Sequence, residues 1–262
     1  MMKRAWACAA ALVFAPALAQ QSPYADYQRM AAESAPIELF ELGGEELWKK
    51  PQGPKNVSLE KCDLGQGPGV LKGAYAGLPR YFADADRVMD LETRLLYCMT
   101  TLQGRGREET TKRVFGNADQ PSEMELLSMF VAGRSHGMPL RPGREHAKEK
   151  ASYALGQKLY FHRAGPWDFS CASCHGEEGK RIRMSELPVL YKPQYARPLM
   201  STWPAYRVST SSVVTLQWRM NDCYRQMRMP EPVFASDATV ALIHFMTVTA
   251  EGVPYRGPAI KR

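Results

Sequence analysis

Apolar residues recur at spacings of three and four along several segments of this chain, which is the periodicity of amphipathic helices. Ser122 and Glu125 stand at the positions of a capping box at the start of one such segment, and Pro230 ends another. No segment alternates apolar and polar residues for long, so no strand is predicted, and the proline- and tyrosine-rich stretch 187–204 is expected to be irregular. The predicted helices cover residues 24–30, 46–50, 78–99, 122–132, 145–161, 213–229 and 236–249.

Glycine and proline break the helical pattern near the middle of the chain. The residues that interrupt it are Gly137, Pro139, Pro142 and Gly143. The helix predicted after them is expected to bury Ala154, Leu155, Leu159 and Tyr160. A length of 262 residues fits one large or two small domains. The sequence therefore predicts a mainly α fold with two helical domains, 20–140 and 141–262.

Residues 1–19 have the three parts of a secretory signal peptide. Lys3 and Arg4 precede an apolar stretch, and Ala17-Leu18-Ala19 forms an A-x-A cleavage site. The apolar stretch is too short to cross a bilayer, and no later run is long enough. We therefore expect export to the periplasm, an oxidising compartment, with no membrane span.

Charge and cysteine content narrow the possible functions. A charged fraction of 23% excludes a disordered or collagen-like chain, and a net charge of +7 favours anionic partners without indicating a nucleic-acid binder. The chain has 6 cysteines. Cleavage after residue 19 would remove Cys8 and leave an odd number, so at least one thiol is expected to remain outside any intramolecular disulfide.

Cys171-Ala-Ser-Cys174-His175 is the C-x-x-C-H attachment signature of c-type haem. Two thiols three residues apart reach the two vinyl groups of the macrocycle, and the adjacent imidazole lies under the iron as the proximal ligand. A zinc site would need a second ligand pair, and no other pair in the sequence has a suitable spacing. A thioredoxin-like site would need a strand–helix context, whereas a predicted helix and a loop precede this motif. The sequence therefore predicts one covalently attached haem, with His175 as a ligand of the iron.

Two kinds of side chain compete for the second axial position on the iron. Simple electron carriers use a methionine, and this chain offers Met184, Met200, Met220, Met227 and Met229. The other candidate is Cys223, with Arg219 four residues earlier on the same helical face. A guanidinium beside a thiol is expected to lower the thiol pKa and to bind anions.

The C-x-x-C-H motif, the R-x-x-x-C-Y pattern at 219–224 and the paired cysteines of the first half resemble the SoxA subunit of SoxAX cytochromes of bacterial thiosulfate oxidation. The resemblance implies two cytochrome c-like domains. It also implies that Cys223 ligates the haem iron and carries a persulfide, and that Arg219 contacts thiosulfate. Arg225, Arg228 and Arg256 have no counterpart in these motifs.

The first half departs from the dihaem members of that family. It lacks the second C-x-x-C-H motif and contains Cys62 and Cys98. As in monohaem members, the resemblance implies a disulfide between them, which would stabilise the fold by about 3–4 kcal/mol. Two reduced thiols are the alternative.

The function implied by the resemblance is that of an L-cysteine S-thiosulfotransferase. Thiosulfate would be coupled oxidatively to a cysteine of the SoxY/SoxZ sulfur carrier, and the electrons would pass to a SoxX-like c-type cytochrome. Two other classes stay open on sequence grounds. One is a periplasmic electron carrier with His/Met ligation, and the other is a structural haem subunit whose partner performs the chemistry.

Overall fold

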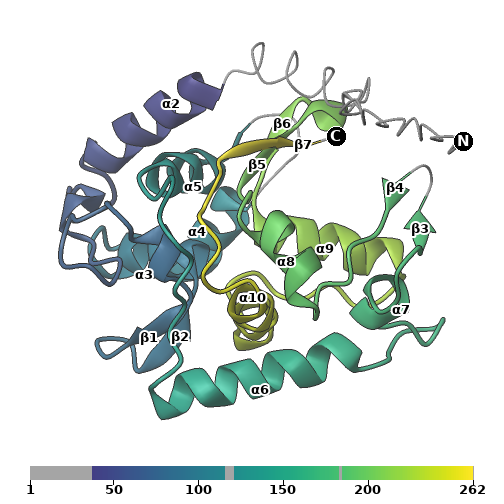
Figure 1. Ribbon diagram of the computed structural model, residues 1–262. Coiled ribbons are helices and arrows are strands. Elements are labelled where there is room, and N and C mark those ends of the chain that lie inside the picture. Colours follow the sequence, from purple (N-terminus) through teal and green to yellow (C-terminus); the bar gives the residue numbers. More distant parts are fainter. Residues whose placement is uncertain (1–36, 116–120, 183–184, 262) are drawn as a thin grey trace, which may run out of the picture.

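The computed structural model describes residues 37–115, 121–182 and 185–261, and most of its regular structure is helical (Figure 1). The predicted helix 24–30 lies outside these ranges. The α-helices are α2 (Ile37–Lys49), α3 (Leu91–Thr101), α4 (Arg107–Val114), α5 (Glu123–Gly133), α6 (Ala147–Phe161), α7 (Cys171–His175), α8 (Pro193–Met200), α9 (Leu216–Gln226) and α10 (Asp237–Thr249). Short 3-10 turns are η1 (Leu59–Lys61), η2 (Tyr75–Gly77) and η3 (Val208–Thr210).

Small sheets join these helices, so the expectation of no strands is wrong. Strands β1 (Arg80–Phe82) and β2 (Arg87–Met89) form one antiparallel pair, and β3 (Arg181–Ile182) and β4 (Ser185–Glu186) form another. In the third sheet β5 (Ala205–Arg207) lies between antiparallel β6 (Ser212–Val214) and parallel β7 (Ala259–Lys261). Strands of two or three residues are too short to produce a visible alternation in the sequence.

The first hydrophobic cluster fills the space between α2, α3 and α5. Trp48, Leu95 and Phe130 are among its buried members. A disulfide joins Cys62, just after η1, to Cys98 of α3 inside this cluster. The cluster also receives Ala235 from the loop between α9 and α10, so the end of the chain contributes to the core of its first half.

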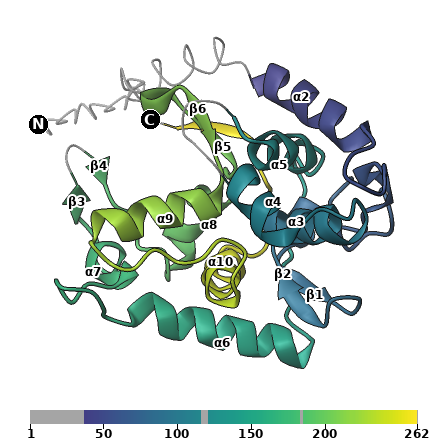
Figure 2. The same ribbon diagram turned by 180° about the vertical axis from the view of Figure 1, so that it is seen from behind.

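The second cluster lies between α6, α8 and α10, and α6 crosses α10, which both views show nearly end-on (Figures 1 and 2). Gly156 permits this close packing, because a Cβ there would lie 1.9 Å from the Ala241 carbonyl oxygen. One turn later Tyr160 is fully buried, with its ring centroid 5.3 Å from that of Phe245. The contact between α6 and α10 therefore fixes the direction in which the chain continues toward α7.

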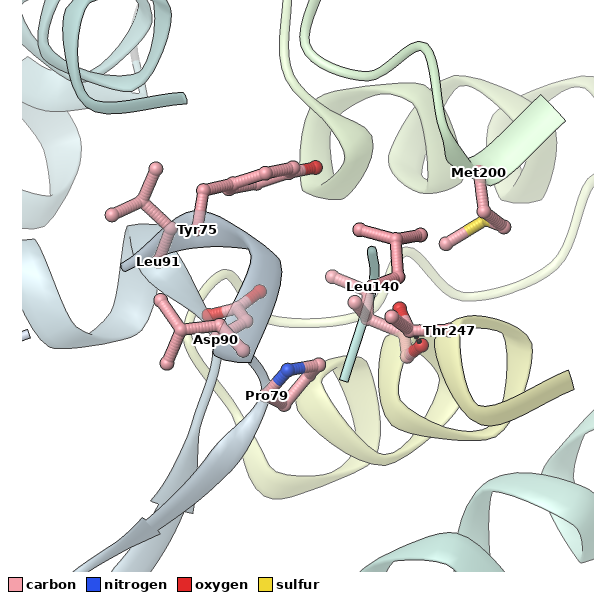
Figure 3. A pocket seen from close by; sticks show the side chains of 9 residues that line it. Tyr75, Pro79, Asp90, Leu91, Leu140, Met200 and Thr247 are labelled. Carbon is pink, nitrogen blue, oxygen red and sulfur yellow. Dashed lines mark hydrogen bonds between the residues drawn. The ribbon is translucent and has the colours of Figure 1, made fainter. Parts of the chain in front are cut away.

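A small cavity separates the two clusters (Figure 3). Its volume of about 20 Å³ is room for roughly one water molecule. Tyr75, Asp90 and Leu91 line one side, and Met200 and Thr247 line the other.

Capping chemistry places several helices where the sequence predicts them. In α5 the Glu125 amide donates to Ser122 Oγ at 3.3 Å, and the Ser122 amide donates to Glu125 Oε2 at 2.6 Å, which is the predicted capping box. Helix α10 begins after Ser236, whose Oγ accepts from the Thr239 amide. The predictions for 122–132 and 236–249 are confirmed.

The helix predicted over 78–99 is wrong in its first half. The β1–β2 hairpin occupies that part, with Asp86 at a φ of +49° in its turn. Asp90 then starts α3, because its side chain accepts from the Thr93 amide. The apolar spacing at Val88 belongs to strand β2, and only the second half of the pattern is helical.

Three other features differ from the prediction. The segment 187–204 contains α8, which begins at Pro193, where a missing N–H costs no helical hydrogen bond. The helix predicted over 213–229 begins after Thr215, because β6 takes the preceding residues. On α6, Ala154 and Leu155 are exposed, and Tyr160 is buried as expected. No helix in the described ranges is long and apolar enough to span a membrane.

Candidate haem site

The C-x-x-C-H motif forms the short helix α7. Ser170 caps it by accepting from the Ser173 amide at 3.2 Å, and Ser173 Oγ accepts from the Ser170 amide at 2.9 Å. Cys171 and Cys174 are unpaired thiols on this helix, and both are half-buried. The arrangement presents the two thiols and the imidazole of His175 from a single turn of backbone.

The imidazole of His175 is held in the orientation that a haem ligand requires. Its Nδ1 lies 2.8 Å from the Pro188 carbonyl oxygen, which can only accept, so Nδ1 carries the proton. The opposite nitrogen, Nε2, therefore has the free lone pair that iron needs. Burial lowers the pKa of His175 and the charge of Arg219 lowers it further, whereas the hydrogen bond to Pro188 raises it. The donor set present here fits a c-type haem.

Hydrogen bonds from neighbouring tyrosines fix the backbone of the motif. The Tyr160 hydroxyl donates to the His175 carbonyl oxygen at 2.8 Å, and the Tyr191 hydroxyl donates to the Gly176 carbonyl oxygen at 3.1 Å. Tyr160 comes from the buried end of α6. The packing of α6 on α10 is thereby transmitted to the position of the iron ligand.

Helix α9, which contains Cys223, ends close to α7 in both views (Figures 1 and 2). Burial raises the pKa of Cys171 to about 12, and the neighbouring charge of Cys223 contributes to that rise. Cys174 in turn raises the pKa of Cys223. Tyr224 forms a side-chain hydrogen bond with Cys171. Cys171, Cys174, His175 and Cys223 are thus gathered around one site.

The electrostatics of Cys223 differ from the sequence expectation. Burial raises the pKa of its thiol, whereas Arg219 and Arg207 lower it and Asp222 raises it further. The expected effect of Arg219 has the correct sign, but burial is the larger contribution. The net pKa is therefore raised, and the prediction of a lowered thiol pKa is wrong.

Arg219 forms an ion pair that was not predicted from the sequence. Its Nη1 lies 2.5 Å from Asp222 Oδ2, and Asp222 also accepts from Arg225 Nη2 at 3.0 Å and Gln226 Nε2 at 2.8 Å. The i, i+3 spacing of Arg219 and Asp222 on a helix is the signal that was available. An anion that binds Arg219 must compete with this carboxylate.

Strands far away in the sequence add cations to this region. Register pairing places Lys261 of β7 beside Arg207 of β5. Lys261 Nζ donates to Thr202 Oγ1 at 2.6 Å and lies 4.8 Å from the centroid of the Trp203 ring. Burial, followed by the charge of Arg219, lowers the pKa of Lys261 to about 8. Neither Lys261 nor Arg207 belongs to a recognisable motif.

The methionine candidates and the remaining arginines occupy other positions. Met200, Met220 and Met227 are buried, the first two within the second hydrophobic cluster, and Met184 lies outside the described ranges. Arg228 and Arg256 are exposed.

Comparisons with known proteins match the chain over most of its length. The family model described as the SoxA/TsdA cytochrome c domain matches residues 43–140, a range that contains the disulfide but not the C-x-x-C-H motif. The chain is 46% identical over 237 residues to the L-cysteine S-thiosulfotransferase subunit SoxA of Hydrogenophilus thermoluteolus, covering 90% of this chain and 86% of that protein. It is 33% identical over 228 residues to a SoxA of Hydrogenobacter thermophilus, covering 87% and 82%.

The fold agrees with a solved structure. The crystal structure of SoxXA from P. pantotrophus superposes with a TM-score of 0.72 at 23% identity, covering 90% of this chain and 84% of that chain. This likeness shows a SoxA-type, mainly helical fold. Together with the identity to curated relatives over most of the chain, it leads to one conclusion: this chain belongs to the SoxA family.

Proposed function

We propose that this chain is the catalytic subunit of an L-cysteine S-thiosulfotransferase. The observation that carries the proposal is the position of Cys223, which α9 places beside Cys171 and Cys174 with Arg219 on the same helix. Curated relatives that share up to 46% identity carry this activity in their names. The substrates are thiosulfate and a cysteine of the SoxY/SoxZ sulfur carrier.

One c-type haem is the proposed cofactor. Cys171 and Cys174 would hold it covalently, and His175 and Cys223 would ligate its iron. When bound, the haem supplies an electron acceptor next to the reacting sulfur. The Pro188 carbonyl oxygen keeps Nδ1 of His175 protonated, and therefore leaves Nε2 as the nitrogen that would ligate the iron.

In the proposed reaction a sulfur–sulfur bond forms between the carrier thiol and the terminal sulfur of thiosulfate. The thiol loses its proton and two electrons leave, so that the product is a thiosulfonate monoester bound to the carrier. Arg219 provides charge-assisted hydrogen bonds to the incoming dianion. Cys223, as a persulfide, supplies a polarisable sulfur next to which thiosulfate and the carrier thiol bind. The electrons pass to a SoxX-like c-type cytochrome that forms a heterodimer with this chain.

The proposed organisation has a signal peptide at 1–19, a haem-free cytochrome c-like domain at 20–140 and a haem domain at 141–262, in the periplasm. Two separate hydrophobic clusters, the first built almost entirely from residues before 132 and the second mostly from residues after it, support two domains. The Cys62–Cys98 disulfide within the first cluster supports the view that a covalent bond replaces a haem there.

Replacement of the proposed catalytic sulfur tests this function. We expect Cys223→Met to keep its haem, because Cys171 and Cys174 are untouched, and to lose thiosulfate coupling to the carrier. Haem content is measured from the absorbance of the purified heterodimer, and coupling is measured from the mass of the carrier. Coupling by Cys223→Met at the wild-type rate would refute the catalytic assignment.

A further inference from the structure

Helix α9, which carries Arg219 and Cys223, is attached to the first half of the chain by a buried side chain. Gln217 is fully buried at the start of this helix. Its Nε2 donates to Asp90 Oδ2 at 2.7 Å and to Thr93 Oγ1 at 3.2 Å. Its Oε1 accepts from the Ala235 amide at 2.8 Å. Both amide protons and the carbonyl oxygen of Gln217 therefore form hydrogen bonds. The two acceptors, Asp90 and Thr93, lie 127 and 124 positions away in the sequence.

The partners of Gln217 are themselves rigidly held. Asp90 is the N-cap of α3, and its other oxygen accepts from the Thr93 amide at 2.9 Å. Glu92 on the same turn accepts from the Gln217 amide at 3.3 Å, and it also forms a side-chain hydrogen bond with Thr215, the N-cap of α9. The N-terminal ends of α3 and α9 are thus joined by a buried polar network.

The loop that follows α9 is also attached to the first half. Arg87 of β2 donates to the Ala235 carbonyl oxygen at 3.1 Å and to Asp237 at 2.6 Å. Phe234 stacks on Phe115 with ring centroids 4.3 Å apart. Both views show α9 running from this region toward α7 (Figures 1 and 2). The helix is therefore held at its beginning and after its end by the part of the chain that lacks the haem motif.

We propose that Gln217 is a positioning residue of the active site: through Asp90 and Thr93 it sets where α9 stands, and so where Arg219 and Cys223 stand relative to the haem motif. This gives the haem-free half a direct role in the reaction. Cys223 lies about 9 Å along the helix axis from Gln217, at a rise of about 1.5 Å per residue. Because a helix is stiff over this length, a displacement of α9 at Gln217 also displaces Cys223. Apolar contacts are non-directional, whereas these hydrogen bonds fix rotation and register. The inference deepens the proposed function and rests on it.

A polarity swap tests the contact. Gln217→Met removes every hydrogen bond of the side chain at similar volume. The double variant Asp90→Asn/Gln217→Glu reverses the direction of the bond. The asparagine introduced by the first change can still cap α3 and donate to the new carboxylate, which accepts from the Ala235 amide. The double variant leaves the net charge unchanged, and Gln157→Met, at an exposed position on α6, is the matched control for the Gln217→Met substitution.

Each variant is measured as the full heterodimer for kcat and KM of thiosulfate coupling, for the electron paramagnetic resonance spectrum of the ferric haem, and for the unfolding temperature. We expect Gln217→Met to lose roughly 10- to 100-fold in kcat, because a misplacement of about 1 Å has effects of this size. Its spectrum should contain more than one low-spin species. The swap should recover kcat to within about threefold of the wild type, and the control should be unchanged.

Two results would overturn the inference: a lowered unfolding temperature with unchanged kcat and spectrum in Gln217→Met, or a swap variant as impaired as Gln217→Met. Failure of the proposed function is recognised separately, because the wild type itself would then not couple thiosulfate. In that case the spectra still decide, since an unchanged haem spectrum in Gln217→Met contradicts the positioning role.

Discussion

The ion pair between Arg219 and Asp222 makes a quantitative prediction about substrate binding. In Arg219→Ala the thiosulfate dianion loses its guanidinium partner. The Asp222 carboxylate then loses its 2.5 Å contact and keeps Arg225 and Gln226 as partners. An incoming dianion therefore meets a carboxylate that Arg219 no longer neutralises. We expect the KM for thiosulfate to rise, and the haem ligands to stay in place.

The magnitude has two contributions. Hydrogen bonds to a charged partner are worth about 1.5–3 kcal/mol, and the lower value applies because the Arg219 side chain is 31% exposed. The negative charge of Asp222, which Arg219 no longer pairs, adds about 1 kcal/mol of repulsion. Together they amount to roughly 2.5 kcal/mol, which corresponds to an increase in KM of about 70-fold.

A double variant separates these contributions. In Arg219→Ala/Asp222→Ala the repulsion is removed, so its KM should be roughly fivefold lower than that of Arg219→Ala. Steady-state kinetics with the carrier and the cytochrome partner present give both values, and the ferric haem spectrum confirms that Cys223 has not moved. An unchanged KM in Arg219→Ala, or a double variant with a KM as high as the single variant, would refute this reasoning.

Three further predictions concern stability. Burial raises the pKa of Glu125 to about 7. The free energy of unfolding should therefore fall by up to about 3 kcal/mol as the pH rises from about 4.5 to 7, because the folded state holds a proton that the unfolded state releases. Glu125→Gln keeps the capping box and should flatten this dependence, which urea titrations at several pH values measure. Replacement of both Cys62 and Cys98 by Ala should lower the free energy of unfolding by about 4 kcal/mol, because the disulfide closes a loop with a sequence separation of 36 and so reduces the entropy of the unfolded chain. A loss below about 1 kcal/mol would contradict this. Gly156→Ala should lower the unfolding temperature, because its Cβ would lie 1.9 Å from the Ala241 carbonyl oxygen, and a gain in stability would show that α6 and α10 are less closely packed.

Local chemistry made part of this fold predictable. The capping box at Ser122 and the N-cap at Ser236 act within four residues, so the sequence alone locates α5 and α10. The C-x-x-C-H spacing is likewise local, and it identifies Cys171, Cys174 and His175 as a group. Where apolar spacing was the only signal, at 78–99, a hairpin and a helix together produced the pattern of one long helix.

Contacts between distant segments were beyond the reach of the sequence. In the sequence Gln217 is an ordinary polar position on a predicted helix. Its proposed role depends on its hydrogen bond to Asp90, which lies 127 residues away. Lys261 reaches the site only because β7 pairs in parallel with β5. The net pKa of Cys223 was mispredicted for the same reason, since burial is a property of the folded chain and Arg219 is visible in the sequence.

The most direct test of this account is the electron paramagnetic resonance spectrum of the ferric wild-type heterodimer, recorded beside that of Cys223→Met. If Cys223 is the sulfur beside the iron, the haem of this chain gives low-spin signals of thiolate ligation that disappear in the variant. A wild-type spectrum that lacks thiolate signals and is unchanged in Cys223→Met would contradict it and would favour the electron-carrier alternative.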